Sequence, residues 1–496
     1  MTMPGGLGRA LRLAAGLIAF VVLCTLNSAG YRFGASDQAF YAPAVIHALH
    51  PDYYPHDAAL IDAQARLTVV DEASATLVRA TGLSLPTTFA LLYVGGLVMF
   101  ALGVAAIGRS LYASPLAIVT LLAATTLRHA IAETGTNTLE GYFHPRQIAF
   151  GFAVWAVVGF LRGRVVLVML ALAAAALIHP TTALWFILWL TVAAIAADRR
   201  LILPASGVAA LAAVAGAWAL TRGPLAGRLG TMDAEWLATL ATKTYLFPLD
   251  WRWSVWLTNL LSPALVVGLY LRRRAAGRLV PREAALVAGN LALLLVFLAS
   301  LPLNAAHVQL AIQLQPARVF WMMDFLATAY MVWALVESGH ASRRRALIVA
   351  SFVALLSVGR GLFIAFVQFP TRPMFAIGLT DSDWGRVMAW ARQSPTSSHW
   401  LAHPAHAFLY GTSLRVAGER DVFVEMSKDQ AIGMYDRPTA IRTRDRLAAI
   451  GDFQALTPTR VQALAAAHDL DFLVTTERLE LPVAFASGAL TVYSLR

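Results

Sequence analysis

The feature that most constrains this chain is a succession of apolar runs, each about 20 residues long, separated by short polar loops. A run of that length can cross the ~30 Å hydrocarbon core of a membrane as a helix. Transmembrane β-strands are shorter and alternate in polarity, so the pattern predicts helices. The 496 residues are only 14% charged, whereas soluble domains carry about 25% charged residues. We therefore predict a mainly α, polytopic membrane protein.

About eleven spans are expected along the chain. We place them near 11–29, 84–108, 114–128, 147–161, 164–178, 180–198, 201–220, 253–271, 284–303, 318–337 and 346–367. Arg9 and Arg12 ahead of the first run would also suit a cleaved signal peptide. Because many further spans follow and residues 30–33 make a poor cleavage site, we treat the first run as a span that stays in the protein.

Arginine is concentrated before the first span and in the loops that follow every second span. The clusters are Arg9 and Arg12, Arg109, Arg162 and Arg164, Arg199 and Arg200, Arg272 to Arg274 with Arg278 and Arg282, and Arg343 to Arg345. Short basic loops are cytoplasmic. Alternating spans put every cluster on that side, so we predict a cytoplasmic N-terminus and a C-terminal tail on the outer side.

The same loops account for the formal net charge of +11, which therefore does not indicate a nucleic-acid partner. Lysine occurs only at Lys243 and Lys428, beside abundant Arg and Ala. This usage is typical of a GC-rich bacterial genome. We therefore predict a bacterial cytoplasmic (inner) membrane protein, in contact with membrane lipids and with its tail in the periplasm.

The character of the chain changes near residue 369, after which no run is long enough to span a membrane. Helix-like stretches over 383–393 and 459–468 alternate with short apolar strands. The strands are expected near 399–401, 422–425, 472–475 and 490–495. We predict two domains, a transmembrane domain over 1–368 and a small soluble α/β domain over 369–496.

The first outer loop, residues 30–82, follows the first span and contains Asp37. Apolar residues recur at helical spacing over 38–50 and over 60–79, so we expect two amphipathic helices along the membrane interface. Asp37 lies at the start of the first helix. Its carboxylate would cap this helix, act as general base near the leaflet surface, or do both.

Three further outer segments carry polar groups close to the membrane, where charged side chains are costly and usually functional. The substrate-binding candidates are Glu140, His144 and Arg146 in the second outer loop, His179 between two apolar runs, and Gln315 and Arg318 at the start of the tenth span. A guanidinium at the outer end of a span suits a phosphate, which it binds in a bidentate fork. The structural alternatives are a solvated turn with internal ion pairs, a satisfied interface histidine, and an ion pair between Arg318 and Asp324.

The motif Asp37-Gln38-x-x-Tyr41, directly after the first span, resembles the acidic first-loop motif of the GT-C superfamily of polytopic membrane glycosyltransferases. That superfamily includes protein mannosyltransferases, aminoarabinose transferases and oligosaccharyltransferase, which use sugars carried on polyprenyl phosphate or diphosphate. The resemblance implies a catalytic Asp37, a substrate-binding Tyr41 and an outer C-terminal domain. Three other motifs are similar to a family of bacterial integral membrane proteins that implies no activity of its own: Pro51-x-x-Tyr54-x-x-Asp57, Gln315-Pro316-x-Arg318 and Asp383-Trp384.

This chain departs from the many GT-C enzymes that have paired acids in the first loop, because the neighbour of Asp37 is Gln38. Asp57 is the candidate for a second acid, and we count it among the substrate-binding residues. A bound divalent metal is therefore one alternative, although the His and Glu residues of the second outer loop lack the tight spacing of metal ligands. The single cysteine, Cys24, excludes an internal disulfide and a Cys-based metal site.

The function predicted from these residues is transfer of a sugar from a polyprenyl-phosphate-linked donor to an acceptor at the outer face of the membrane. Asp37 would be the base, and Arg318 with Arg146 would hold the donor phosphate. A transporter or lipid flippase would use the same polar groups without catalysis, although no matching pair of interrupted helices marks inverted repeats. A non-enzymatic envelope assembly protein is the third alternative.

Overall fold

Apolar helices form the larger part of the molecule, whose computed structural model describes residues 5–65, 68–223, 225–338 and 342–496. Within these residues, seven helical stretches are long and apolar enough to cross a membrane. They lie in α1 (Gly5–Asn27), α5 (Leu85–Leu111), α9 (Pro180–Ala197), α12 (Trp253–Ala275), α13 (Glu283–Ala305), α14 (Gln309–Leu314) with η4 (Pro316–Arg318) and α15 (Val319–Val336), and α16 (Arg343–Phe363) with η5 (Ile364–Gln368). Four shorter apolar stretches lie in α6 (Pro115–Thr125), α7 (Pro145–Leu161), α8 (Val165–Ile178) and α10 (Ile202–Thr221). Each predicted span falls on one of these helices, and the chain is a multi-pass helical membrane protein.

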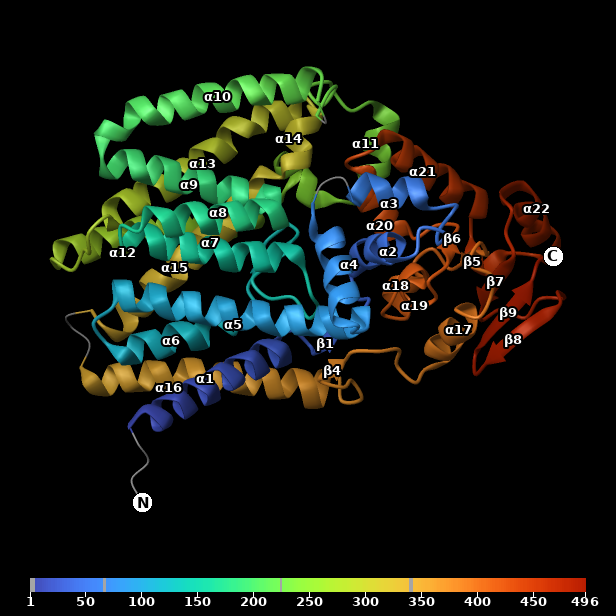
Figure 1. The fold of residues 1–496 in the computed structure, drawn as a ribbon, viewed down its shortest axis with the longest axis horizontal. Coiled ribbons are helices and arrows are strands. Elements are labelled where there is room, and N and C mark those ends of the chain that lie inside the picture. Colours follow the sequence, from blue (N-terminus) through green and yellow to red (C-terminus); the bar gives the residue numbers. More distant parts are fainter. Residues whose placement is uncertain (1–4, 66–67, 224, 339–341) are drawn as a thin grey trace.

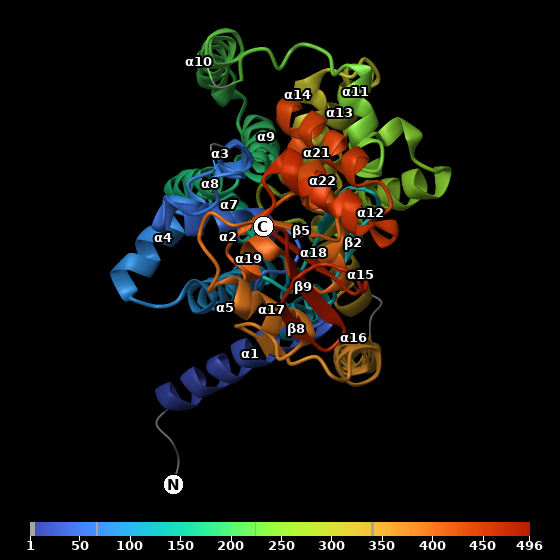
Figure 2. The ribbon, with the colours of Figure 1, turned by 90° about the vertical axis from the view of Figure 1, so that its right-hand side faces the viewer.

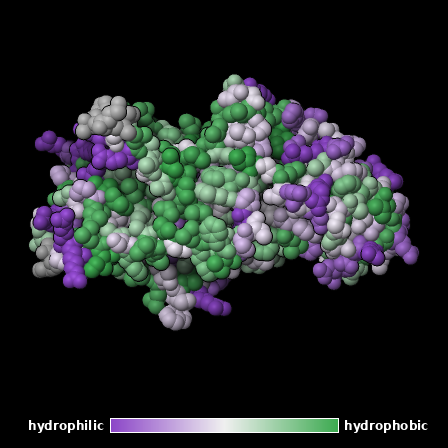
Figure 3. All heavy atoms as spheres, turned by 90° about the horizontal axis from the view of Figure 1, so that it is seen from below, coloured by the Kyte–Doolittle hydropathy of each residue, from purple (hydrophilic) through white to green (hydrophobic). Residues whose placement is uncertain are grey.

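Most of these helices lie side by side along the long axis, and the C-terminal residues form a separate layer at one end (Figure 1). In the view toward that end, α10 stands apart at the edge of the bundle (Figure 2). Hydrophobic residues cover the middle of the face in Figure 3, between a hydrophilic end and the mixed surface of the C-terminal residues. An apolar band between two polar ends is what a bilayer requires of a spanning protein.

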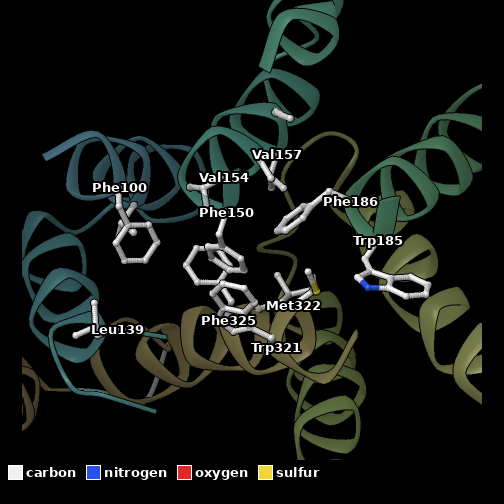
Figure 4. Close-up of a cluster of buried hydrophobic side chains, with 14 of the residues drawn as sticks. Phe100, Leu139, Phe150, Val154, Val157, Trp185, Phe186, Trp321, Met322 and Phe325 are labelled. Atoms are coloured by element: carbon white, nitrogen blue, oxygen red, sulfur yellow. The ribbon is translucent and has the colours of Figure 1, made fainter. Parts of the chain in front are cut away.

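α7 lies inside the bundle, where it contacts α5, α8 and α9. Phe150 of α7 stacks on Trp321 of α15 with 4.0 Å between the ring centroids, and meets Phe186 of α9 edge-on (Figure 4). Aromatic pairs of this kind contribute about 0.5–1.5 kcal/mol beyond the burial of their area. Elsewhere small residues allow close approach: a Cβ added to Gly289 of α13 would lie 2.3 Å from the carbonyl oxygen of Trp189. Such packing fixes the helix ends that carry the site.

The first outer loop contains β1 (Tyr31–Arg32), α2 (Gln38–Leu49), α3 (Ala58–Ala65) and α4 (Val70–Thr81). The helix predicted over 38–50 corresponds to α2, but the one predicted over 60–79 is divided into α3 and α4. The sequence predicts α2 along the membrane interface, whereas the structure buries most of its residues. The reason is that α2 lies between the helix bundle and the C-terminal residues (Figure 1).

The second outer loop begins with a short antiparallel hairpin of β2 (Ala130–Ile131) and β3 (Thr136–Asn137). Its Gly141 touches the chain after α1: an added Cβ would lie 2.5 Å from the carbonyl oxygen of Gly30. The carbonyl of Gly141 also accepts a hydrogen bond from the N–H of Arg32 at 2.8 Å. Glycine at 141 therefore lets the two outer loops meet through their backbones.

The C-terminal residues form a small α/β domain, as the sequence predicts. Its strands are β5 (His399–Ala402), β6 (Asp421–Val422), β7 (Phe472–Thr475), β8 (Val483–Ser487) and β9 (Leu490–Ser494). Its helices are α17 (Asp383–Ala391), α18 (His406–Leu409), α19 (Leu414–Ala417), α20 (Met426–Gly433), α21 (Arg437–Ile450), η6 (Phe453–Ala455) and α22 (Pro458–His468). The five strands form one sheet in the order β6-β5-β7-β9-β8, with β5 parallel to β6 and β7 and with β9 antiparallel to β7. The four predicted strands are present, β6 being shorter than expected.

Short elements fill the remaining connections. They are η1 (Arg199–Leu201), α11 (Ala234–Leu240), η2 (Thr244–Leu246), η3 (Pro248–Asp250) and β4 (Phe375–Ala376). β4 pairs in parallel with β1, which ties the start of the C-terminal residues to the end of α1. α11 packs against α20 and α21. The C-terminal domain is thus held at the bundle from two sides.

Candidate functional site

A cavity of about 1310 Å³ lies where the two outer loops, the ends of several helices and α20 meet. Eight of the nine side chains predicted for the site line it: Asp37, Tyr41, Glu140, His144, Arg146, His179, Gln315 and Arg318. They come from the first and second outer loops, the start of α9 and the chain around η4. The structure therefore brings together residues from four distant parts of the sequence.

Asp37 occupies the N-cap position of α2, but its side chain makes no capping hydrogen bond. One carboxylate oxygen instead lies 2.6 Å from Nζ of Lys428 in α20, and the other lies 3.0 Å from Nε2 of His144. Burial alone would raise the pKa of Asp37, but the charge of Lys428 and the hydrogen bond to His144 outweigh it and hold the pKa well below its usual range. The Asp37 carboxylate is therefore ionised and points into the cavity.

His144 and His179 each precede a proline that opens a helix. In both, Nδ1 accepts a hydrogen bond from a backbone N–H of the first turn, from Arg146 in α7 and from Thr182 in α9. Since Nδ1 of His144 is an acceptor, its Nε2 carries the hydrogen that is donated to Asp37. Burial, followed by the charge of Arg146, lowers the pKa of His144, so this imidazole is neutral. The capping geometry fixes both rings at the cavity wall.

Gln38, which stands where many GT-C enzymes have a second acid, is a fully buried link between the outer loops. Its Oε1 accepts from the N–H of Gly34 at 2.6 Å, and its Nε2 donates to the carbonyl of Phe143 at 3.0 Å. Gly34 has φ = +78°, a conformation that favours glycine. Gln38 thereby places Asp37 opposite His144, which follows Phe143 directly.

Glu140 and Arg146 form an ion pair with an N–O distance of 2.7 Å, and each side chain is only 5% exposed. Arg146 also donates to the carbonyl of Gly135 at 3.0 Å, while its buried Nε has no partner within the described residues. The second outer loop therefore does contain an internal ion pair, but the pair is buried at the cavity rather than solvated. A buried donor without a partner costs free energy unless a ligand satisfies it.

Arg318 pairs with no carboxylate among the described residues. Asp324, its predicted alternative partner, instead pairs with His129 at 2.8 Å. The Nε of Arg318 is buried and unpartnered within the described residues. The neighbouring Gln315 has a left-handed backbone with φ = +50°, and its Nε2 donates to the hydroxyl of Tyr435 at 3.2 Å. Backbone strain of this kind is concentrated at functional sites.

Sequence reasoning did not place Lys428 and Tyr435 in the site, because both lie in the C-terminal domain, far along the chain from Asp37. Lys243 also lines the cavity and donates to the carbonyl of Ser427 at 3.0 Å. Burial, and then the charge of Lys428, lowers the pKa of Lys243 to about 8. The chain has two lysines and both line this cavity, so their rarity was the one signal that could have found them.

Asp57, predicted as a second acid of the site, does not line the cavity. Its fully buried carboxylate lies 2.7 Å from Nε of Arg415 and 3.3 Å from Nη2 of Arg442. It also accepts from the N–H of Val422 at 3.2 Å. The Asp57 carboxylate is therefore paired with residues of the C-terminal domain, and it joins the first outer loop to that domain.

The charges around the cavity are unequal in sign, because nine lining side chains are Lys or Arg and three are Asp or Glu. Two of the acids, Asp37 and Glu140, are already paired with Lys428 and Arg146. Positive charge with low-dielectric walls attracts anions. Within the residues that the structure describes, no group of three or more His, Cys, Asp or Glu is arranged to hold a metal ion. The arrangement suits an anionic ligand.

No family model and no curated protein matches the sequence. Among solved structures, the chain is similar to the archaeal oligosaccharyltransferase AglB from Archaeoglobus fulgidus in complex with an inhibitory peptide and a dolichol-phosphate, with a TM-score of 0.44 and 12% identity over 94% of this chain and 69% of that chain. The apo form of the Archaeoglobus fulgidus oligosaccharyltransferase gives a TM-score of 0.43 and 12% identity over 93% and 69%.

Proposed function

We propose that this protein is a GT-C-type membrane glycosyltransferase, which transfers a sugar from a polyprenyl-phosphate-linked donor to an acceptor at the outer face of the membrane. The observation that carries the proposal is Arg318, which lines the cavity and pairs with no carboxylate among the described residues. Guanidinium groups bind phosphate through two parallel N–H···O bonds. Arg318 and Arg146 together supply such donors for the phosphate of the donor lipid.

The chemistry assigned to the site is a single displacement at the anomeric carbon. The acceptor oxygen forms a bond to that carbon while the bond from the carbon to the phosphate oxygen breaks, and polyprenyl phosphate leaves with the electron pair. The guanidinium groups of Arg318 and Arg146 stabilise the charge that develops on this leaving group. Asp37 takes the acceptor proton as the new bond forms, when the hydroxyl is most acidic.

The test of this proposal is transfer from a radiolabelled polyprenyl-phosphate sugar in membranes that contain equal amounts of each variant. Asp37→Asn preserves shape and removes the base, so turnover should fall by roughly 10²–10⁴-fold. The matched control is Asp62→Asn, an exposed acid in the same outer loop, which should leave turnover unchanged. Parental turnover in Asp37→Asn would place the base elsewhere. A parent that transfers sugar from none of these donors would favour transport or lipid flipping by the same cavity.

A further inference from the structure

A second group of guanidinium side chains lines the cavity beside α1 and α16. Arg32 belongs to β1, Arg128 follows α6, Arg360 lies near the end of α16, and Arg372 follows η5. The salt bridges among the described residues include none of these four. Most other loop arginines lie at the opposite ends of the helices, in the clusters that predict the cytoplasmic side.

No acid of the cavity neutralises this group. Asp37 is held by Lys428 and Glu140 by Arg146. The third, Asp436, caps α21 by accepting from the N–H of Thr439 at 2.9 Å. Several like charges in one partly buried wall repel one another more strongly than in water, so an anion bound among them is stabilised.

The geometry of the group leaves donors available for such an anion. Nη1 of Arg360 donates to the carbonyl and the side-chain oxygen of Asn27 at 2.8 and 2.9 Å, which fixes the guanidinium at the end of α1. The guanidinium carbon of Arg372 lies 3.8 Å from the ring centroid of Phe369, and stacking on a ring leaves the N–H edge of the fork exposed. Burial, and then the charge of Arg372, lowers the pKa of Arg32, as expected for neighbouring cations.

An apolar rim adjoins these arginines. η5 is a π-helical turn, a feature frequent at functional sites, and its Ile364 and Gln368 line the cavity. Phe366 and Val367 of the same turn are exposed, in a helix that is long and apolar enough to lie in the membrane. A ligand with its anionic group on Arg372 would have its chains beside this turn. The wall therefore suits an amphiphile better than a free anion.

We propose that Arg32, Arg360 and Arg372 form a second anion subsite, which binds the phosphate of the acceptor lipid while the donor phosphate lies on Arg146 and Arg318. That the bound lipid is the acceptor depends on the function proposed above, whereas the anion subsite is inferred from the arginines alone. The acceptor is then a phosphate-bearing amphiphile with a free hydroxyl. That hydroxyl attacks the anomeric carbon, its proton passes to Asp37, and the acceptor phosphate remains unchanged.

The first test is binding, without reference to activity. The full-length protein in phosphatidylcholine nanodiscs is titrated with fluorescent phosphatidic acid in the presence of saturating polyprenyl phosphate, which occupies the donor subsite. The parent should retain a bound fraction, and Arg32→Gln with Arg372→Gln should weaken its affinity by about tenfold or more. Arg32→Lys with Arg372→Lys should retain most of it. Arg164→Gln, an exposed arginine outside the cavity, should bind as the parent does.

Three results would overturn the subsite: equal affinity in the double Gln variant, displacement of all phosphatidic acid by polyprenyl phosphate, or displacement by millimolar inorganic phosphate, which would indicate a free anion. Retained binding of polyprenyl phosphate by the double Gln variant shows that this variant is folded.

Kinetic measurements distinguish the acceptor subsite from the proposed glycosyl transfer. A raised acceptor KM with an unchanged donor KM supports the subsite, whereas an unchanged acceptor KM in an active transferase refutes it alone. If the double Gln variant loses phosphatidic acid binding but the parent transfers no sugar, the subsite stands and only the proposed glycosyl transfer is refuted.

Discussion

Asp37 is held by two partners that act on it differently. His144 is neutral and donates one hydrogen bond at 3.0 Å, whereas Lys428 adds a full positive charge at 2.6 Å. Burial works against both by disfavouring the carboxylate. Lys428 is the largest single cause that lowers the pKa of Asp37, although it belongs to the C-terminal domain and Asp37 to the first outer loop.

Lys428→Met should raise the pKa of Asp37, because the positive charge that offsets the effect of burial is removed. In the parent, Asp37 is ionised across the accessible pH range, so kcat/KM should not fall on the acid side until well below pH 4, the usual range of an aspartate. In the variant the acid limb should move to higher pH, since the base loses activity where it is protonated. Lys428→Arg keeps the charge and should restore the parental profile. A Met variant with the parental profile would show that Lys428 has no influence on the base.

Arg318 should contribute mainly to the donor. Arg318→Lys keeps the charge but loses the bidentate fork, so the donor KM should rise by about tenfold while turnover survives. Arg318→Gln loses the positive charge as well and should raise the donor KM further. Donor titrations in membranes with matched protein levels measure both effects, with Arg164→Lys as the control. An unchanged donor KM in Arg318→Gln would remove Arg318 from the phosphate site.

At the residue scale, prediction succeeded where chemistry is visible in one short stretch. Asp37, His144 and Arg318 are polar groups next to apolar runs, and all three line the cavity. Asp57 has the same local appearance, but a buried arginine of the tail binds it. Lys428 was not assigned to the site, because its partner Asp37 lies 391 positions away in the chain and no local pattern joins the two. Partners that meet only through the fold leave no local pattern.

The element that joins the two parts of the molecule is α19 with its buried arginine. Arg415 lies 2.7 Å from Asp57 of the first outer loop and 2.6 Å from Asp429 of α20. The hydroxyl of Tyr54 donates to the carbonyl of Arg415 at 2.7 Å. Removing one carboxylate leaves Arg415 with the other, so the loss should be smaller than for a buried charge left alone.

Asp57→Ala should loosen this docking by about 1.5–3 kcal/mol, the range for a hydrogen bond to a charged group. Amide hydrogen exchange in α19 and β6 should accelerate by about 10–100-fold, because local opening exposes those amides. Asp62→Ala, which removes an exposed acid of α3, should leave exchange in both elements unchanged. Parental exchange in Asp57→Ala would mean that Asp429 alone holds Arg415.

At the element scale, long periodic patterns were the easiest to predict. Each predicted span corresponds to an apolar helix, and β7 begins and ends where the sequence predicts. The division of residues 60–79 into α3 and α4 was missed, because the apolar positions continue across the break. β8 was missed because Val483 and its neighbours are mostly exposed and carry no buried face. Burial of α2 depends on the tail above it and could not be inferred from the loop alone.

At the scale of the whole molecule, the C-terminal domain lies at one end of the helix bundle (Figure 1), and its helix α20 lines the cavity. We propose that residues 1–368 form the membrane domain and residues 369–496 the outer domain, which completes the cavity with Lys428. The end of the bundle with the cavity carries the lysines and arginines that line it. The opposite end carries the loop arginines that predict the cytoplasmic side. Which face holds the cavity then follows from the orientation of the bundle.

That orientation can be measured with the single native cysteine left in place, since Cys24 is fully buried. Gln454→Cys introduces a thiol on the exposed surface of the C-terminal domain, and Ala276→Cys introduces one at the exposed end of α12, beside the arginines that follow it. In intact spheroplasts a membrane-impermeant maleimide should label Gln454→Cys and not Ala276→Cys, because short basic loops stay in the cytoplasm. Detergent should make Ala276→Cys reactive, which confirms that its thiol is accessible, and the parent should stay unlabelled. The reverse pattern would place the cavity in the cytoplasm, where a nucleotide-linked sugar is a better donor than an outer-leaflet polyprenyl phosphate.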